Sequence, residues 1–189
     1  MKIVLKYLTI CLLFLIPFAC NSKKERNHEE KEGYFSVSQF LDDQWKNREG
    51  IPYTLLKVTN FNGIIDSSFV GLDSITWKEI RKYFDAADIS NPELVGKYHF
   101  SHYDEDVLNL AMFSYEAASE KLWVQKTDIG YDQTNNRIKM VYIETQKKNF
   151  VSLEKQKLLY IPDETIQIQT YQKTLISKAK DLKITYYFQ

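Results

Sequence analysis

Glycine is scarce in this 189-residue chain, which contains six glycines, at positions 33, 50, 63, 71, 96 and 130. Phosphate-binding loops and dinucleotide-binding fingerprints need closely spaced glycines, because the backbone must approach the phosphate. The six positions allow neither motif to be written. The chain also lacks a Gly-x-Ser-x-Gly segment, the turn that presents the serine of an α/β-hydrolase. These absences argue against nucleotide chemistry of those kinds and give a serine hydrolase no support.

Histidine is scarcer still, with three in the chain. His99 and His102 precede three carboxylates at positions 104–106, which makes this segment the densest set of potential metal ligands. If residues 98–103 form a strand, side chains three apart point to opposite faces of the sheet. His99 and His102 are therefore weak candidates for a metal site, since their rings converge only at a turn or a bulge. We expect no metal and no cofactor.

Neither sign of charge is in excess, because 25 Lys and Arg balance 25 Asp and Glu. A nucleic-acid-binding protein shows a basic patch or stripe, which this balance does not predict. We expect no nucleic acid among the partners. Paired-carboxylate catalysis is a different case, because the two acids can come from distant segments and leave no spacing signature.

The first twenty residues have the pattern of an export signal. Lys2 and Lys6 precede an apolar stretch that ends on the segment Pro17-Phe18-Ala19-Cys20. The alternative is a membrane-spanning helix, which needs about 20 consecutive apolar residues. The apolar stretch at 7–19 has only thirteen residues before a polar tract begins. A cleaved signal is the better interpretation.

This segment resembles the signal of bacterial lipoproteins, and residues 34–189 have the general layout of small bacterial lipoproteins. The resemblance implies cleavage after Ala19, acylation of Cys20 with palmitate or similar chains, and a place in the cell envelope. Stable anchoring takes at least two lipid signals, because one acyl chain binds only marginally. Asn21 is not the aspartate that directs retention in the inner membrane, so the resemblance favours the outer membrane of a Gram-negative bacterium. The similarity of layout implies no catalytic or binding residue.

Only two cysteines occur, Cys11 and Cys20, and Cys11 lies in the part of the chain that cleavage removes. A single remaining cysteine cannot form an internal disulfide. Modification of Cys20 also leaves no cysteine to act as a nucleophile. The fold must therefore be held by core burial alone, which a chain of this length can supply.

The composition predicts three parts: a signal peptide at 1–19, a lipidated cysteine with a flexible tether at 20–33, and a single domain at 34–189. Residues 21–33 contain no apolar side chain and are too polar to pack. Thirteen residues reach roughly 45 Å when fully extended. The domain would therefore lie close to the bilayer.

The domain opens with helical patterns. Apolar residues recur at helical spacing from Val37 to Trp45, where Ser36 and Gln39 form a possible capping box. A second helix is predicted at 73–85, with a possible capping box of Thr76 and Glu79. Asn91-Pro92 is typical of the start of a short third helix, which should end near residue 96.

Strand patterns fill the rest of the domain. Asn62-Gly63 between 53–61 and 64–70 predicts a type I′ hairpin, because both turn positions need positive φ. Further strands are predicted at 107–115, 122–127, 137–145, 150–161, 166–170 and 182–188. Their short connections favour antiparallel pairing, since a parallel crossover needs a dozen or more residues. The predicted class is α+β, with N-terminal helices packed on a curved antiparallel β-meander.

Aromatic residues leave two arrangements open. Tyr186, Tyr187 and Phe188 follow one another, so aromatics point to both faces of that strand. One face of the sheet could cover the core while the other offers aromatics to a ligand. We favour the other arrangement, in which both faces are packed, because helices are available to cover the second face.

Two classes of function survive. The first is a noncatalytic lipoprotein that binds an unidentified protein or small molecule at the envelope and is held to the membrane through acyl chains on Cys20. The second is an envelope hydrolase built on two carboxylates in a cleft. The absence of catalytic motifs favours the first, so we lean against an enzyme and assign no catalytic residue.

Overall fold

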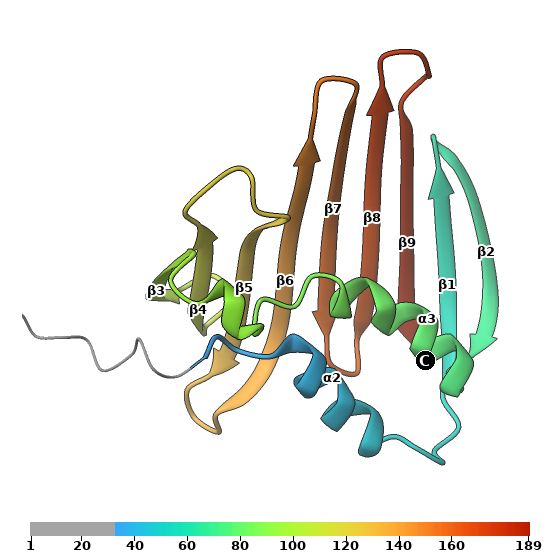
Figure 1. The fold of residues 1–189 in the computed structure, drawn as a ribbon. Helices are drawn as coiled ribbons and strands as arrows, with labels where there is room; N and C mark the ends of the chain where they lie inside the picture. The colour runs from blue at the N-terminus through green and yellow to red at the C-terminus, as the bar shows by residue number, and fades with distance from the viewer. Residues whose placement is uncertain (1–32) are drawn as a thin grey trace, which may run out of the picture. The chain divides into compact units, whose positions relative to one another are not determined.

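The computed structural model describes residues 33–189, which belong to one compact unit. Nine strands form one antiparallel sheet, and two short α-helices lie across one side of it (Figure 1). The signal segment and Cys20 lie outside the described residues, as does the tether up to residue 32.

The helices are α2 (Val37–Lys46), α3 (Ser74–Asp85) and a 3-10 helix, η3 (Pro92–Leu94). The strands are β1 (Thr54–Phe61), β2 (Ile64–Gly71), β3 (Tyr98–Glu105), β4 (Leu110–Ala117), β5 (Val124–Asp132), β6 (Arg137–Lys148), β7 (Ser152–Ile161), β8 (Thr165–Thr174) and β9 (Lys180–Phe188).

The strand order is β2-β1-β9-β8-β7-β6-β5-β4-β3. Strands β3 to β9 follow one another in space as they do in sequence, which makes a seven-stranded meander. The earlier β1–β2 hairpin is added beside β9, so the first and last strands of the domain are hydrogen-bonded neighbours. Strands β2 and β3 are left as the two edges of the sheet.

The predicted α+β class is wrong. Residues 33–189 form mostly a nine-stranded antiparallel sheet, only 16% of them are helical, and no large helix among them packs on the sheet. The helical patterns were located correctly, but they make just two short helices, while nearly all of the chain after residue 96 goes into long strands joined by tight turns. The antiparallel pairing itself is confirmed.

The strand register divides the sheet into two faces. Tyr186, Ile166, Tyr160 and Val141 are cross-strand neighbours on the face that the helices cover, and all are buried. Leu55 of β1 is buried on the same face and pairs with Phe188. We call this the helical face and the opposite one the open face. The favoured arrangement, in which both faces are packed and helices cover the second one, is not seen in the described residues, because α2 and α3 lie on the same side (Figure 1).

The core lies between the helices and the helical face, and its centre is aromatic. The ring of Tyr160 is completely buried and makes edge contacts with Phe40, Trp77 and Phe84, at centroid distances of 5.9, 6.3 and 6.4 Å. Helix α2 also stacks Trp45 on Trp77 of α3 at 5.7 Å. Burying one such large side chain stabilises a fold by roughly 1.5–3 kcal/mol. The two short helices are therefore held mainly by this packing.

The helix starts are fixed by side-chain caps. Ser36 accepts a hydrogen bond from the backbone N–H of Gln39 (3.2 Å), as the sequence predicts for α2. The predicted capping box of Thr76 with Glu79 is wrong, because Asp73 is the cap of α3 and accepts from the N–H of Thr76 at 2.7 Å. Asp73 lies one turn before the predicted cap and accepts a hydrogen bond from a backbone N–H that has no partner within the helix.

The predicted hairpin is confirmed. Asn62 (φ 51°) and Gly63 (φ 90°) both adopt positive φ between β1 and β2, as a type I′ turn requires. Several strand ends differ from prediction. Strand β4 begins at Leu110 rather than at residue 107, where Val107 is 89% exposed in the turn, and β6 continues to Lys148.

Candidate functional site

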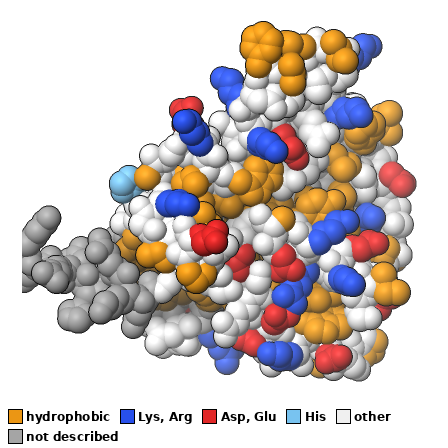
Figure 2. Space-filling view, in the orientation of Figure 1, with side chains coloured by type: hydrophobic (Ala, Val, Ile, Leu, Met, Phe, Trp, Pro, Cys, Tyr) orange, Lys and Arg blue, Asp and Glu red, His pale blue; other side chains and the backbone are white. Residues whose placement is uncertain are grey.

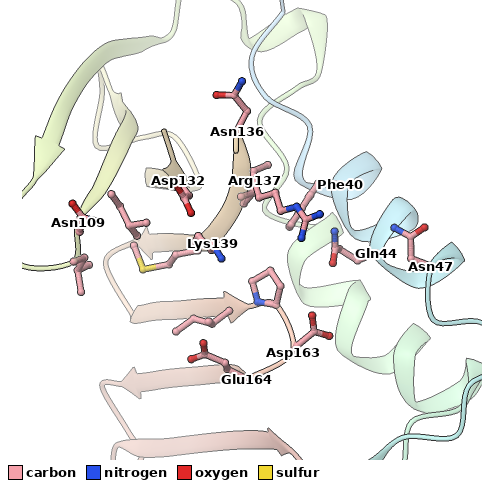
Figure 3. A pocket seen from close by; sticks show the side chains of 16 residues that line it. Phe40, Gln44, Asn47, Asn109, Asp132, Asn136, Arg137, Lys139, Asp163 and Glu164 are labelled. Carbon is pink, nitrogen blue, oxygen red and sulfur yellow. The ribbon is translucent and has the colours of Figure 1, made fainter. Parts of the chain in front are cut away.

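An open pocket of about 990 Å³ lies at one end of the strands (Figure 3). Four segments form it: the side of α2, the β3–β4 turn, the β5–β6 turn with the start of β6, and the β7–β8 turn. The labelled polar and aromatic lining residues are Phe40, Gln44, Asn47, Asn109, Asp132, Asn136, Arg137, Lys139, Asp163 and Glu164. Turns and the strand ends beside them thus supply most of its polar groups.

Three of these turns are closed by residues with left-handed backbone. Asn109 (φ 52°), Asn136 (φ 54°) and Asp163 (φ 61°) are three of the four non-glycine residues with positive φ in the described part of the chain. Asn and Asp tolerate this conformation better than other residues, because a short polar side chain can bond its own backbone. The sharp turns place all three residues in the pocket wall.

A buried arginine ties the pocket's walls together. Arg48, only 6% exposed, donates to Asp163 from Nε (3.2 Å) and Nη2 (2.5 Å) and to the carbonyl and side chain of Gln44 from Nη1 (3.0 Å each). It also lies over the ring of Phe188, 5.7 Å from the centroid. A guanidinium this deep needs such partners to offset its desolvation. The contacts fix the end of α2 against the β7–β8 turn.

A second carboxylate of the pocket is also engaged. Asp132 accepts from the hydroxyl (2.6 Å) and N–H (2.9 Å) of Thr134 and from the side-chain amide of Asn135 (2.9 Å). The hydrogen bonds from Thr134 are the main reason that the pKa of Asp132 is lowered. This carboxylate is therefore ionised at neutral pH and serves as an acceptor rather than a proton donor.

The lining combines charges of both signs with an apolar floor. Arg137 and Lys139 bring two cations, and Asp132, Asp163 and Glu164 bring three carboxylates. The apolar part consists of Phe40, Leu108, Leu110, Ile138, Met140, Ile161 and Pro162. Such a surface suits a ligand with charges of both signs and a hydrogen-bonding backbone.

A smaller hollow of about 250 Å³ adjoins this pocket and shares Asn109, Leu110 and Asp132 with it. Its other lining includes Asp104, whose carboxylate accepts from the side chain of Gln133 at 2.7 Å. Within residues 33–189, no group of three or more His, Cys, Asp or Glu is arranged to hold a metal ion.

The two histidines singled out from the sequence are not brought together. His99 and His102 are both exposed and lie on opposite faces of β3, where they pair with Glu116 and Phe113. His102 shares a hydrogen bond of 3.1 Å with the hydroxyl of Tyr131. Cys20, the predicted lipidation site, lies outside the described residues.

The open face carries a charge network that sequence reasoning missed. Asp128, 6% exposed, accepts from the hydroxyl of Ser114 (2.6 Å) and pairs with Lys126 (3.0 Å). Next to it, Glu144 accepts from the hydroxyl of Tyr142 and pairs with Lys157 at 3.3 Å. The sequence signal for this network was the alternation of charged residues along β5, β6 and β7. Only the strand register shows that these charged side chains lie next to one another on the open face.

The charged and hydroxyl groups of this network bind one another. Burial opposes the charge of Lys126, yet the hydrogen bond and charge of Asp128 outweigh it and raise the pKa of the lysine. Burial and the neighbouring Glu144 raise the pKa of the Tyr142 hydroxyl. Ser114 is only 1% exposed, so it cannot meet a substrate. The arrangement stabilises the open face and offers no nucleophile.

The side of the molecule seen in Figure 2 shows acidic and basic side chains interspersed, with apolar side chains gathered at the top. Two adjoining hairpin tips hold exposed apolar residues, Phe150 (92%) and Val151 (54%) in one and Leu175 (69%) and Ile176 (99%) in the other. The N–H of Leu175 donates to the carbonyl of Val151 at 3.1 Å. These tips protrude and line neither hollow.

None of the helices within residues 33–189 is both long enough and apolar enough to span a bilayer. Comparison of the chain with family models, with curated proteins and with solved structures gave no match.

Proposed function

We propose that the chain is an envelope lipoprotein, anchored through acyl chains on Cys20, and that its domain binds a short peptide segment in the turn-lined pocket without catalysing a reaction. The N-terminal pattern supports the anchor. The pocket supports the binding role, because its two cations, three carboxylates and side-chain amides match the charges and backbone groups of a peptide.

The engagement of two of the pocket's three carboxylates, Asp132 and Asp163, carries the noncatalytic part of the proposal. A hydrolase of the paired-carboxylate kind needs one acid with a raised pKa to protonate the leaving group. Asp132 has a lowered pKa, and Asp163 is bound to the guanidinium of Arg48. The other carboxyl groups with a shifted pKa, Asp73, Asp88 and Glu144, are lowered as well. The four carboxyl groups with a lowered pKa are ionised at neutral pH and accept hydrogen bonds.

The anchor is tested by labelling a Gram-negative host that expresses the full chain with an alkyne analogue of palmitate. The wild type should take up the label, and the intact mass should show loss of residues 1–19. Cys20→Ala should abolish the label, whereas Cys11→Ala should keep it. An unlabelled wild type, or equal labelling of the Cys20 variant, would show that the anchor is wrong.

The binding role is tested with a library of tripeptides that carry both charges, titrated into isotope-labelled protein and followed by NMR. Bound peptides should shift the amides around Asn136, Arg137 and Asp163. Arg137→Ala should weaken a selected peptide at least tenfold, which corresponds to about 1.4 kcal/mol. Lys183→Ala, an exposed lysine outside the pocket lining, is the matched control.

Two outcomes would contradict this binding role. One is the absence of shifts at the pocket with every peptide in the library, and the other is equal affinity for the wild type and the Arg137 variant. Chromatography of the library after incubation separates binding from catalysis. Cleaved peptides would favour the hydrolase instead.

A further inference from the structure

The two edges of the sheet differ in how they are protected. Exposed sheet edges attract other strands, and proteins usually blunt them with charged residues, proline or a bulge. Strand β3 carries two histidines and two carboxylates in eight residues. Strand β2, Ile-Ile-Asp-Ser-Ser-Phe-Val-Gly, has one charge, Asp66, and no proline. Its Ile65 and Phe69 are 68% and 69% exposed.

The hydrogen bonds within the chain show which groups of β2 face outward. Phe61 and Ile64 flank the two-residue turn and form the first hydrogen-bonded pair of the hairpin. Bonded pairs alternate with non-bonded pairs along an antiparallel ladder. Just past β2, the N–H of Leu72 donates to the carbonyl of Tyr53 at 2.9 Å. This pair is hydrogen-bonded, as the alternation of bonded and non-bonded pairs predicts for residue 72. The even-numbered residues of β2 therefore bond β1.

The backbone groups of residues 65, 67 and 69 consequently point away from the sheet, and no strand of the described residues lies beside them. A two-fold axis between identical antiparallel strands must pass through a residue that faces itself. Among the outward-facing residues, Ser67 is the one nearest the middle of β2. A register centred there opposes Ile65 of each copy to Phe69 of the other, whereas a register centred on Ser68 would oppose these two side chains to Gly71 and Ser67.

We propose that β2 pairs antiparallel with β2 of a second copy of this chain, about a two-fold axis at Ser67, so that two sheets become one. Three bonded pairs exchange two hydrogen bonds each, or about six in all. Ile65 and Phe69 make two apolar cross-strand pairs on the open face. Asp66 faces Ser68 of the other copy, so the lone charge of the strand meets no like charge.

The dimer should be weak and reversible. A strand edge buries much less than the roughly 800 Å² per partner of a standard interface. Sedimentation equilibrium of a chain that starts at residue 20 and carries Cys20→Ser tests it, since every described core residue lies in the retained part. The wild type should show a concentration-dependent shift from monomer to dimer. A wild type that stays monomeric at the highest soluble concentration would overturn the proposal.

Neighbouring serines distinguish this register from any other. Ser67→Lys places two lysines face to face on the axis and should weaken the dimer at least tenfold. Ser68→Lys adds the same charge one position away, but the new lysine lies opposite Asp66 of the other copy, so association should be equal or tighter. Equal loss of association in both variants would contradict the register, and circular dichroism checks that both are folded.

Cross-linking gives a second test that does not depend on affinity. Residues of a bonded antiparallel pair have Cα atoms about 5.5 Å apart, which is within the range that a disulfide spans. In the same chain, which has no other cysteine, Ser67→Cys should form a covalent dimer under mild oxidation. Ser68→Cys should stay largely monomeric. Equal cross-linking at the two positions would overturn the proposed axis.

Discussion

The two faces of the sheet use opposite means to bury their side chains. On the helical face, Leu158 and Tyr160 are completely buried under two short helices. None of the helices within residues 33–189 covers the open face, and Ser114 and Asp128 are buried by one another and by neighbouring strands. The first face is stabilised by apolar area, whereas the second depends on complete hydrogen bonding of its polar groups. Because alternate residues of a strand point to opposite faces, one strand can supply apolar side chains to the helical face and hydrogen-bonded polar side chains to the open face.

The largest expected difference comes from adjacent leucines of β7. Leu158 is fully buried on the helical face, and Leu159 is half-buried on the open face. Leu158→Ala removes contacts from a packed core and should lower the free energy of unfolding by about 2–5 kcal/mol. Leu159→Ala should cost less than half as much. Urea denaturation of both variants measures the contrast, and equal costs would mean that the open face is packed as tightly as the helical face.

The charge network of the open face should be the next most sensitive feature. Asp128→Ala leaves the buried hydroxyl of Ser114 without an acceptor and Lys126 without its partner. We expect a loss of about 1–3 kcal/mol, since Lys126 retains contact with water. Glu116→Ala is the control, because Glu116 is exposed on the same face and should change stability by less than about 0.5 kcal/mol. A neutral Asp128 variant would show that the pairing does not stabilise the face.

Two threonines, Thr145 on the helical face and Thr165 on the open face, test how much a hydrogen-bond partner for the hydroxyl contributes to stability. The hydroxyl of Thr145 is buried without a hydrogen-bond partner among the described residues. The hydroxyl of Thr165 donates to the carbonyl of Tyr186 at 3.0 Å. Thr145→Val removes an unpaired polar group and should raise the unfolding free energy by about 0.5–1 kcal/mol, whereas Thr165→Val should lower it by about 1 kcal/mol. Thermal unfolding measures both, and destabilisation by Thr145→Val would show that its hydroxyl is paired.

Local patterns predicted most of the fold. The hairpin at Asn62-Gly63, the cap at Ser36 and the antiparallel strands all depend on residues close together in sequence, where turn geometry and side-chain period act directly. The predicted class was wrong because the spacing of apolar residues and the lengths of the segments do not show that nine strands would dominate the structure over two short helices. Nor does sequence show that β9 returns to pair with β1, since that contact joins segments more than 120 residues apart.

The candidate pocket was beyond sequence reasoning for the same reason. Its polar groups come from turns at 109, 132–137 and 163–164 and from one side of α2. Each segment alone is an ordinary turn or helix surface. Asn109, Asn136 and Asp163 carried a weak signal as turn residues, but only the strand order brings their turns to one end of the sheet. His99 and His102 are close together in sequence, but they lie on opposite faces of β3.

The smallest expected effect is a pH dependence on the open face. Burial alone would raise the pKa of Glu144, but the hydrogen bonds from Tyr142 and Lys157 outweigh it and leave the pKa below its ordinary value of 4.5. A lowered pKa stabilises the fold above the unfolded value, and this contribution is lost as the pH falls through the folded value.

Glu144→Gln removes that contribution. The wild type should exceed the variant in unfolding free energy by less than about 1 kcal/mol at neutral pH, because Lys157 and Glu144 are partly exposed. This difference should shrink below about pH 4.5 as the wild-type carboxyl group takes up its proton. Urea denaturation between pH 3 and 7 measures it, with Glu120→Gln in an exposed loop as control. A difference that does not change with pH would mean that Glu144 acts through packing rather than through its charge, and the contrast between the two faces would then depend on Asp128 alone.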